Sequence, residues 1–299
     1  MQEIKKPHVG FIGFGEASFE ICRGLKSEGL TGIVAYDKYW DTPPRASLIK
    51  SRALEAGVIL LASSAEVVTK SDVIFCAVNA NAAVSIAREA APFLGKGKIY
   101  VDINSASPRT KQDVAKIVES VGADFVDIAI MGAVPEQRHR VLMLACGSGV
   151  KKLIDLMSHY GMNIKDVGEM PGVSSAIKMC RSVFMKGYAA LWIECLLAAS
   201  AYGCENVVLD SICESIEGKD LHNYVLSFLV RTGIHAERRA AEMREVISTL
   251  KDANLASAIS EASLYYLDRI KSLSLSEDWL QSPPRRIEEV IAAFKKGWS

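Results

Sequence analysis

Short apolar runs alternate with amphipathic stretches along about the first 168 residues of the chain. A short apolar run predicts a strand, and an apolar stripe that returns every three to four residues predicts a helix. Regular alternation of the two is typical of an α/β fold with a doubly wound, mostly parallel sheet. The predicted strands lie near residues 8–13, 32–37, 58–61, 72–78, 98–104, 124–131 and 140–146.

The last two predicted strands differ from the others in their connection. Only a polar stretch around residues 136–139 separates them. A parallel pair needs a crossover of about a dozen residues or more, which this stretch is too short to provide. We therefore expect these two strands to pair antiparallel at one side of the sheet.

The pattern changes after Gly172, where strand signals stop and helical periodicity continues. Residues 174–202 are strongly apolar and contain no Gly or Pro except Gly187. Such a segment predicts a long helix that is buried on several sides and contributes to a homodimer interface. We expect two domains: an α/β domain over residues 1–170 and an all-helical substrate and dimerisation domain over residues 171–299.

A glycine-rich turn follows the first predicted strand and opens a helix. Gly13 permits a tight turn, and Gly15 lets the backbone approach a pyrophosphate. The helix that begins near Glu16 directs its unpaired amides at that negative charge. Asp37 ends the second strand about 20 residues later, the spacing of a carboxylate that binds an adenosine ribose. The pattern predicts a Rossmann-type dinucleotide-binding domain, with cofactor contacts from Gly13, Phe14, Gly15, Glu16, Ala17, Ser18, Asp37 and Lys38.

Two residues of this motif leave a question open. Ser18 stands where Gly or Ala is preferred for close packing of the helix on the strand. Asp37 repels a 2′-phosphate and so favours NAD, whereas Lys38 and Arg45 keep NADP compatible with the sequence. We expect NAD as the cofactor, with NADP as the alternative.

Further binding residues are expected at the carboxyl ends of the strands, where open parallel sheets hold their ligands. Val78 and Asn79 follow the fourth strand, and Asn104 and Ser105 follow the fifth. Ser107 and Pro108 predict a helix N-cap and first turn, which leaves Asn104 and Ser105 free for the cofactor unless both only cap the turn. Beyond the sixth strand, backbone amides suited to a substrate carboxylate are expected at Met131, Gly132 and Ala133.

The helical half begins with a polar stripe. Ser174, Lys178 and Ser182 stand four residues apart on one face of the predicted helix. A lysine in this setting either extends to the surface or lies beside a cofactor, where desolvation lowers its pKa. In the second case neutral Lys178 accepts a hydroxyl proton as the hydride leaves the same carbon. Arg181 either holds a substrate anion or is solvated.

Composition narrows the function classes. Lysine plus arginine equals aspartate plus glutamate at 35 each, so no global field attracts nucleic acid or an anionic membrane. The seven cysteines include no CxxC pair, and the five histidines form no metal-ligand spacing. No apolar run approaches the roughly 18 residues of a membrane span. We expect a cytoplasmic protein with reduced thiols and without a metal, signal peptide or transmembrane helix.

The order of the motifs resembles that of the β-hydroxyacid dehydrogenase family, which includes 3-hydroxyisobutyrate, tartronate semialdehyde and 6-phosphogluconate enzymes. The resemblance is carried by the glycine loop with Asp37, by Asp102-x-x-Ser105-x-x-Pro108, by Asp127-x-x-x-x-Gly132 and by Gly172-x-x-x-x-x-Lys178. The loop GFGEAS and the helical segment 235–243 are similar to a divergent 6-phosphogluconate-dehydrogenase-like branch. The resemblance implies that Lys178 is the general acid/base and that Asn104 and Ser105 lie beside nicotinamide and substrate.

The sequence departs from the family on the substrate side. Members usually carry a serine before paired glycines that grip the substrate carboxylate, and an asparagine one turn after the lysine. Met131 and Ser182 occupy those positions here, and Ala133 replaces the second glycine. The substrate is therefore expected to differ in shape from the usual small hydroxyacid.

Three basic residues are the predicted replacements for the lost substrate contacts. His235, Arg238 and Arg239 occur where the family's C-terminal helices close over the active site, and they suit a second carboxylate, a phosphate or a sulfonate. They also fit a solvated basic helix face paired with Glu237 and Glu242.

The leading hypothesis is an NAD(P)-dependent oxidoreductase acting on a small anionic hydroxyacid or on the matching carbonyl compound. If the product is a β-keto acid, the Lys178 ammonium also suits stabilisation of the enolate of a following decarboxylation. The alternatives are an imine reductase, against which Lys178 argues, and a catalytically silent NAD(P)-binding protein.

Overall fold

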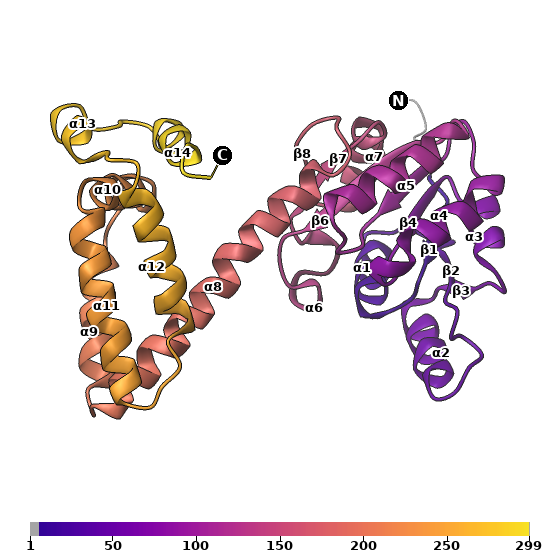
Figure 1. Cartoon of the computed structure of the whole chain (residues 1–299). Coiled ribbons are helices and arrows are strands. Elements are labelled where there is room, and N and C mark those ends of the chain that lie inside the picture. The colour runs from indigo at the N-terminus through magenta and orange to yellow at the C-terminus, as the bar shows by residue number, and fades with distance from the viewer. Residues whose placement is uncertain (1–5, 299) are drawn as a thin grey trace. The chain divides into compact units, whose positions relative to one another are not determined.

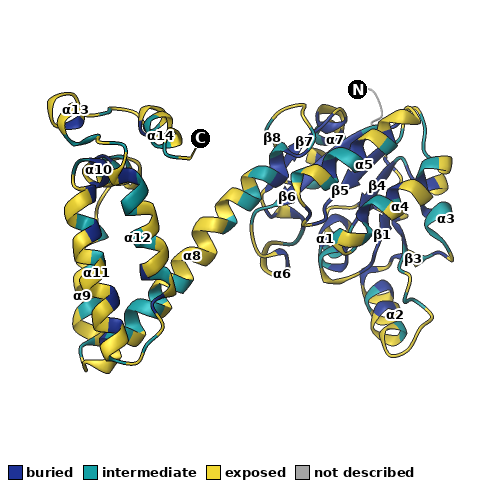
Figure 2. Ribbon diagram, viewed as in Figure 1, coloured by how far each residue is buried: buried dark blue, intermediate teal, exposed yellow. Residues whose placement is uncertain are grey.

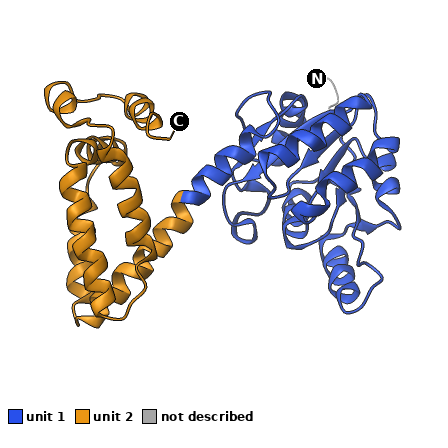
Figure 3. Cartoon of the chain, viewed as in Figure 1, with its two compact units in different colours: residues 1–183 blue, residues 184–299 orange. Residues whose placement is uncertain are grey.

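The computed structural model describes residues 6–298 and divides into two compact units, residues 1–183 and 184–299 (Figures 1 and 3). The first unit contains every strand of the described chain, and the second is built from helices. The fold is a Rossmann-type α/β domain followed by an all-helical region, as the sequence predicted.

Eight strands within the described residues form one sheet in the order β3-β2-β1-β4-β5-β6-β7-β8. Neighbouring strands from β3 to β6 are parallel, and β6 and β7 pair antiparallel, which confirms both expectations about the sheet. The strands are β1 (Val9–Ile12), β2 (Val34–Tyr36), β3 (Ile59–Leu60), β4 (Val73–Cys76), β5 (Ile99–Asp102), β6 (Asp124–Ile130), β7 (Met143–Cys146) and β8 (Ile164–Asp166).

Strand β8 was not predicted from the sequence; it pairs parallel with β7 at the edge of the sheet. Its three residues Ile164, Lys165 and Asp166 are partly or fully exposed and include two charges, so no apolar run marks them. A strand this short takes its structure from its neighbour rather than from its own residues.

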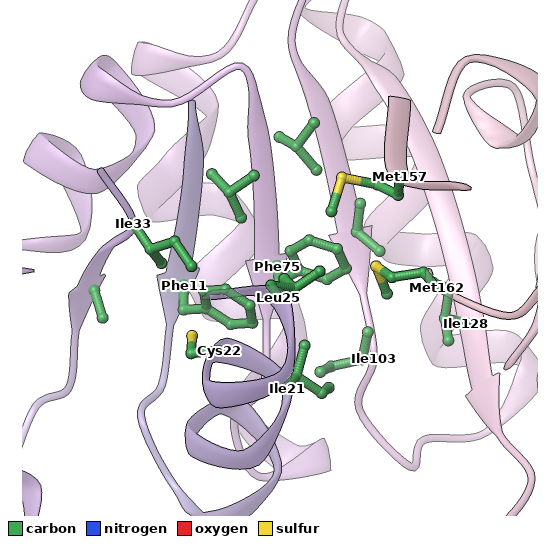
Figure 4. Packing of buried hydrophobic residues seen from close by; sticks show 14 of the residues in the cluster. Phe11, Ile21, Cys22, Leu25, Ile33, Phe75, Ile103, Ile128, Met157 and Met162 are labelled. Carbon is green, nitrogen blue, oxygen red and sulfur yellow. The ribbon is translucent and has the colours of Figure 1, made fainter. Parts of the chain in front are cut away.

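Helices cover both faces of the sheet, which explains why β1, β4 and β5 are apolar at nearly every position. One core contains the stacked rings of Phe11 and Phe75, 5.0 Å between centroids, together with Leu25 and Ile21 of α1 (Figure 4). The core on the other face is built around Tyr100 and Phe125. The helices of this unit are α1 (Glu16–Ser27), α2 (Arg45–Ala56), α3 (Ser64–Lys70), α4 (Ala83–Ala90), α5 (Pro108–Ser120), α6 (Val134–Gln137) and α7 (Val150–Met157).

The second unit has a small core in which Val230, Trp279 and Val290 are buried. Gly233 permits this packing, because a Cβ there would lie 2.2 Å from the Trp279 ring. Its helices are the C-terminal part of α8 (Val173–Ala201), then α9 (Glu205–Ile216), α10 (Leu221–Ile234), α11 (Ala236–Asp252), α12 (Ala258–Lys271), α13 (Ser276–Gln281) and α14 (Ile287–Lys295).

Helix α8 confirms the predicted long helix but corrects its predicted burial. Much of the α8 ribbon is coloured as exposed (Figure 2), and its exposed apolar residues include Val183, Phe184 and Ile193. Among the described residues, α8 is also the one helix long and apolar enough to cross a membrane by length and composition. Charged residues interrupt the apolar sequence of α8, so it contains no uninterrupted apolar run of that length. The absence of a membrane partner therefore stays a prediction.

Candidate cofactor and active site

The glycine turn between β1 and α1 is the structural centre of the candidate site. Gly13 has a φ of +88°, and its N–H donates to the carbonyl oxygen of Tyr36 over 2.7 Å. A Cβ at this position would lie 2.1 Å from the carbonyl oxygen of Ala77. Only glycine fits a backbone that is both left-handed and pressed against the end of β4.

Gly15 has a different role, because its backbone conformation is extended and open to other residues. Apart from Gly15 itself and its two chain neighbours, a Cβ there would meet no atom of the described residues within 4 Å. Gly15 is also the N-cap of α1, so the unpaired amides of the first helical turn adjoin this open space. The loop thus leaves a cradle for a pyrophosphate at the positive end of a helix.

The structure explains the serine at the third position of the motif. Ser18 is fully buried, and its hydroxyl donates to the carbonyl oxygen of Gly13 over 2.7 Å. The side chain therefore holds the glycine turn in place, whereas the sequence suggested only a tolerated departure.

Asp37 holds the other side of the loop. Its Oδ2 accepts the N–H of Phe14 over 2.8 Å, and its Oδ1 accepts the N–H of Tyr39 over 2.9 Å. Each carboxylate oxygen has a further lone pair for a ribose hydroxyl. Phe14 itself is fully buried, so its part in the loop is played by its backbone.

These residues open onto a cavity of about 600 Å³ in the first unit. Six residues of the predicted cofactor set line it, namely Gly13, Gly15, Asp37, Lys38, Val78 and Asn79. The cavity is also lined by residues that were not predicted from the sequence, among them Tyr39, Ala82, Ser85, Ile86 and Glu89. The other six predicted contacts do not line this cavity, and their contact with a cofactor stays a prediction: Phe14, Glu16, Ala17, Ser18, Asn104 and Ser105.

Two cationic side chains lie over the ring of Tyr39, which lines the cavity. The Lys38 ammonium lies 4.7 Å and the Arg45 guanidinium 4.6 Å from the centre of its ring. Lys38 and Arg45 line the same cavity as Asp37. The cradle at Gly15, the carboxylate at Asp37 and this cavity fit an NAD dinucleotide.

Asn104 is not free at its strand tip, which corrects one expectation. It is 5% exposed, and its Oδ1 accepts the N–H of Val78 over 2.5 Å. Its own N–H donates to Asp102 Oδ1 over 2.9 Å. Asn104 therefore ties the tips of β4 and β5 together, while Ser105 is exposed beside it. The predicted N-cap is confirmed, since Ser107 Oγ accepts the N–H of Thr110.

The loop after β6 offers fewer amides than expected. The N–H of Met131 donates to the carbonyl oxygen of Leu142 over 2.8 Å and so extends the antiparallel pairing. Gly132 and Ala133 are exposed at the start of α6. The amide of Met131 is therefore committed to the sheet, and the substrate role of this loop stays a prediction.

The start of α8 is anchored on β6. Ser174 Oγ donates to the carbonyl oxygen of Asp127, and Ser175 Oγ donates to Asp127 Oδ1, both over 2.9 Å. Lys178 follows one turn after Ser174 on the same face of the helix and is partly buried. Ser182, a further turn along, is also partly buried, and Arg181 is exposed.

One charged residue of this region was missed by sequence analysis. Lys111 of α5 is fully buried and pairs with Asp102 and Asp127. A lysine on an amphipathic helix is ordinarily solvated, so the pattern offered no signal for it.

The predicted basic residues of the helical half lie in the second unit. His235 and Arg238 line a cavity of about 650 Å³ there, and Arg238 also pairs with Glu242. Arg239 donates to Thr232 Oγ1 over 2.6 Å and lies 5.0 Å from the centre of the Phe228 ring. Their substrate role stays a prediction. No group of three metal-ligating side chains occurs within residues 6–298.

Comparison with known proteins follows the same division of the chain. Residues 8–168 match the family model described as the NAD binding domain of 6-phosphogluconate dehydrogenase, and residues 199–268 match a domain of unknown function, DUF1932. An uncharacterized 28.5 kDa protein of Methanothermus fervidus is 30% identical over 83% of this chain and 92% of its own. Bovine mitochondrial 3-hydroxyisobutyrate dehydrogenase is 27% identical over 60% of this chain, and the match spans about half of that enzyme, 53%.

Two solved structures are informative. A conserved protein of unknown function, described as structurally similar to 3-hydroxyacid dehydrogenases, is 34% identical, with a TM-score of 0.61 over 90% of this chain and 98% of its own. An imine reductase from Pseudomonas sp. shares the fold, with a TM-score of 0.72 over 97% of this chain and 99% of its own at 18% identity.

The fold and the glycine site define a Rossmann-type NAD-binding protein. The chain belongs to the β-hydroxyacid dehydrogenase family, within which its N-terminal part is the 6-phosphogluconate dehydrogenase type of NAD-binding domain.

Proposed function

We propose that the chain is an NAD(P)-dependent oxidoreductase that acts on a small anionic hydroxyacid, with Lys178 as the general acid/base. One observation carries the proposal. The first turn of α8 is anchored on Asp127 by Ser174 and Ser175, and the next turn presents a partly buried lysine in a chain with an intact cofactor loop.

In this proposal, different residues bind the cofactor, transfer the proton and hold the substrate. When bound, the nicotinamide supplies the acceptor or donor of a hydride. The amides of α1 bind the pyrophosphate beside Gly15, and Asp37 orients the adenosine ribose. The Nζ of Lys178 takes the substrate hydroxyl proton in oxidation and returns it to the carbonyl oxygen in reduction. Exposed Gly132 and Ala133 hold the substrate carboxylate, with Ser105, Arg181 and Ser182 beside it.

If oxidation produces a β-keto acid, the Lys178 ammonium stabilises the enolate left when CO₂ departs. Two other functions remain as outcomes of the test. The imine reductase structure shares only the fold, and a silent NAD(P)-binding protein is favoured by the altered Met131 and by the commitment of its amide to Leu142.

A substrate panel tests the proposed activity. The absorbance of reduced nicotinamide is followed with hydroxyacids that bear no second anion, a carboxylate, a phosphate or a sulfonate. Turnover restricted to doubly anionic members is expected, because His235, Arg238 and Arg239 suit a second anion. Cofactor binding without turnover on any hydroxyacid would favour the silent protein, and turnover on cyclic imines alone would favour an imine reductase.

Cofactor preference is expected to depend on Asp37. The parent protein should bind NAD about tenfold more tightly than NADP, because a 2′-phosphate beside the carboxylate costs Coulomb energy that Lys38 and Arg45 offset only in part. Asp37→Asn should narrow the preference, since the amide keeps an acceptor but loses the charge. Titration calorimetry with both cofactors measures this. A parent that prefers NADP, with Lys38→Met removing that preference, would reverse the assignment.

We further propose a homodimer in which α8 contributes to the interface. The residues Ile193, Leu197 and Leu209 are exposed and line an apolar groove of about 490 Å³ on the second unit. A helix that is apolar on most sides needs an apolar partner, and a second copy supplies the same helix by two-fold symmetry. Ile193→Lys should convert a dimer to a monomer in light scattering, whereas Lys186→Glu should not. A monomeric parent protein would refute the proposal.

A further inference from the structure

A buried lysine joins two strands behind the candidate site. The Nζ of Lys111 donates to the carbonyl oxygen of Asp102 over 2.9 Å and to its Oδ1 over 2.8 Å, and it lies 3.1 Å from Asp127 Oδ1. Asp102 and Asp127 are partners in the register of β5 and β6, and all three side chains are at most 1% exposed. One basic side chain thus lies between two acidic side chains in the core.

Each carboxylate also holds part of the site. Asp102 Oδ1 accepts the N–H of Asn104, whose side chain holds the N–H of Val78 at the neighbouring strand tip. Asp127 Oδ1 accepts the hydroxyl of Ser175, and its Oδ2 accepts the Ser175 N–H over 3.3 Å. Lys111 therefore connects the strand tips on the cofactor side with the first turn of α8.

Stability alone is a weak reason for this arrangement. Taking three charged groups out of water is costly, and well-packed apolar residues often replace such a triad without loss of stability. The other oxygen of Asp102, Oδ2, is buried without a hydrogen-bond partner within residues 6–298, which adds to the cost. What the triad does supply is directional contact between β5, β6 and α8.

We propose that Lys111 is a positioning residue, which holds the first turn of α8 at a fixed place relative to the strand tip at Asn104 and Ser105. The inference rests on the proposed role of Lys178, which lies three residues after Ser175. Hydride and proton transfer must be aligned on one substrate carbon, and a displacement of about 1 Å can lower a rate about a hundredfold.

The test uses a double variant that keeps the buried charge constant. Lys111→Met with Asp102→Asn removes one basic and one acidic side chain, so the formal charge is unchanged and Asp127 keeps its contacts to Ser175. We expect kcat to fall about tenfold to a hundredfold, while KM for NAD changes less than about twofold. Hydrogen exchange of the amides of residues 173–182 should become about tenfold faster. The exchange readout needs no substrate.

Lys98→Met is the matched control. The Nζ of Lys98 holds the carbonyl oxygens of Val68 and Ser71, 2.6 and 2.7 Å away, at the opposite end of β5. This variant should lower the melting temperature without changing kcat or the exchange of residues 173–182.

A second variant covers the case in which the double variant does not fold. Ser175→Ala cuts the link on the side of α8 without touching a charge, and it should reproduce both the faster exchange and the lower kcat. Unchanged exchange in whichever variants fold would overturn the positioning role. If the parent protein turns over no substrate, the proposed activity fails, and the exchange data still decide whether Lys111 holds α8.

Discussion

Replacement of Lys178 by alanine is expected to lower kcat about a thousandfold and to leave the affinity for NAD unchanged. General acid/base catalysis by a positioned side chain contributes roughly a hundredfold to ten-thousandfold, and Lys178 is proposed as the sole proton carrier. Cofactor affinity should persist because the cavity that fits NAD is lined by the glycine turn, Asp37 and the tip of β4, and not by α8. Steady-state kinetics and titration calorimetry measure the two quantities separately.

Lys186→Ala is the control for this variant. Lys186 lies two turns further along α8 and is exposed, so its removal takes away a charge without a proposed proton. It should retain the parent rate. Near-parental kcat in Lys178→Ala would show that another group, or water, carries the proton, and the assignment of Lys178 would be withdrawn.

Gly15→Asp is expected to weaken NAD binding at least a hundredfold while the melting temperature stays within about 2 °C of the parent. The new side chain points into the open space beside the first turn of α1, so it strains nothing in the fold. Its carboxylate would occupy the cradle and repel the pyrophosphate from the amides that bind it. A hundredfold loss corresponds to about 2.8 kcal/mol. Thermal shift and calorimetric titration with NAD check both halves of the prediction.

Two other glycines show that the effect is specific. Gly95→Asp also places its side chain in open space, but ahead of β5, and should change neither stability nor binding. Gly13→Ala should instead destabilise the fold by about 3 kcal/mol or more, because φ is +88° and the Cβ would meet the carbonyl oxygen of Ala77. Tight NAD binding by Gly15→Asp would mean that the cofactor does not cross this loop.

The glycine loop shows which features of a site can be predicted from residues close together in the sequence. Gly13, Gly15 and Asp37 could be assigned because each meets a backbone or charge requirement within a single strand–turn–helix–strand unit. Ser18 could be placed in the motif but not explained, since its bond to the carbonyl oxygen of Gly13 exists only once the turn has closed.

The contacts at the strand tips and within the buried triad of Asp102, Lys111 and Asp127 could not be predicted in this way. Asn104 was expected to face the cofactor, but its side-chain oxygen instead accepts the N–H of Val78. The two residues come within hydrogen-bond distance only when β4 and β5 pair. Lys111 reads as a surface lysine until β5 and β6 bring Asp102 and Asp127 together in register. Contacts between residues about 10 to 50 positions apart carry no local periodicity.

The sequence by itself determined the class of the fold, the antiparallel β6–β7 pair, the all-helical second half and the position of the dinucleotide loop. Those properties follow from hydrophobic periodicity and from glycine conformations, which act over a few residues. Only the tertiary structure decided which polar groups are committed to the protein itself: Asn104 to a neighbouring strand, the Met131 amide to the sheet and Lys111 to two carboxylates. The physical reason is that burial makes a polar group find a partner, and the partner is chosen by the packing of distant segments.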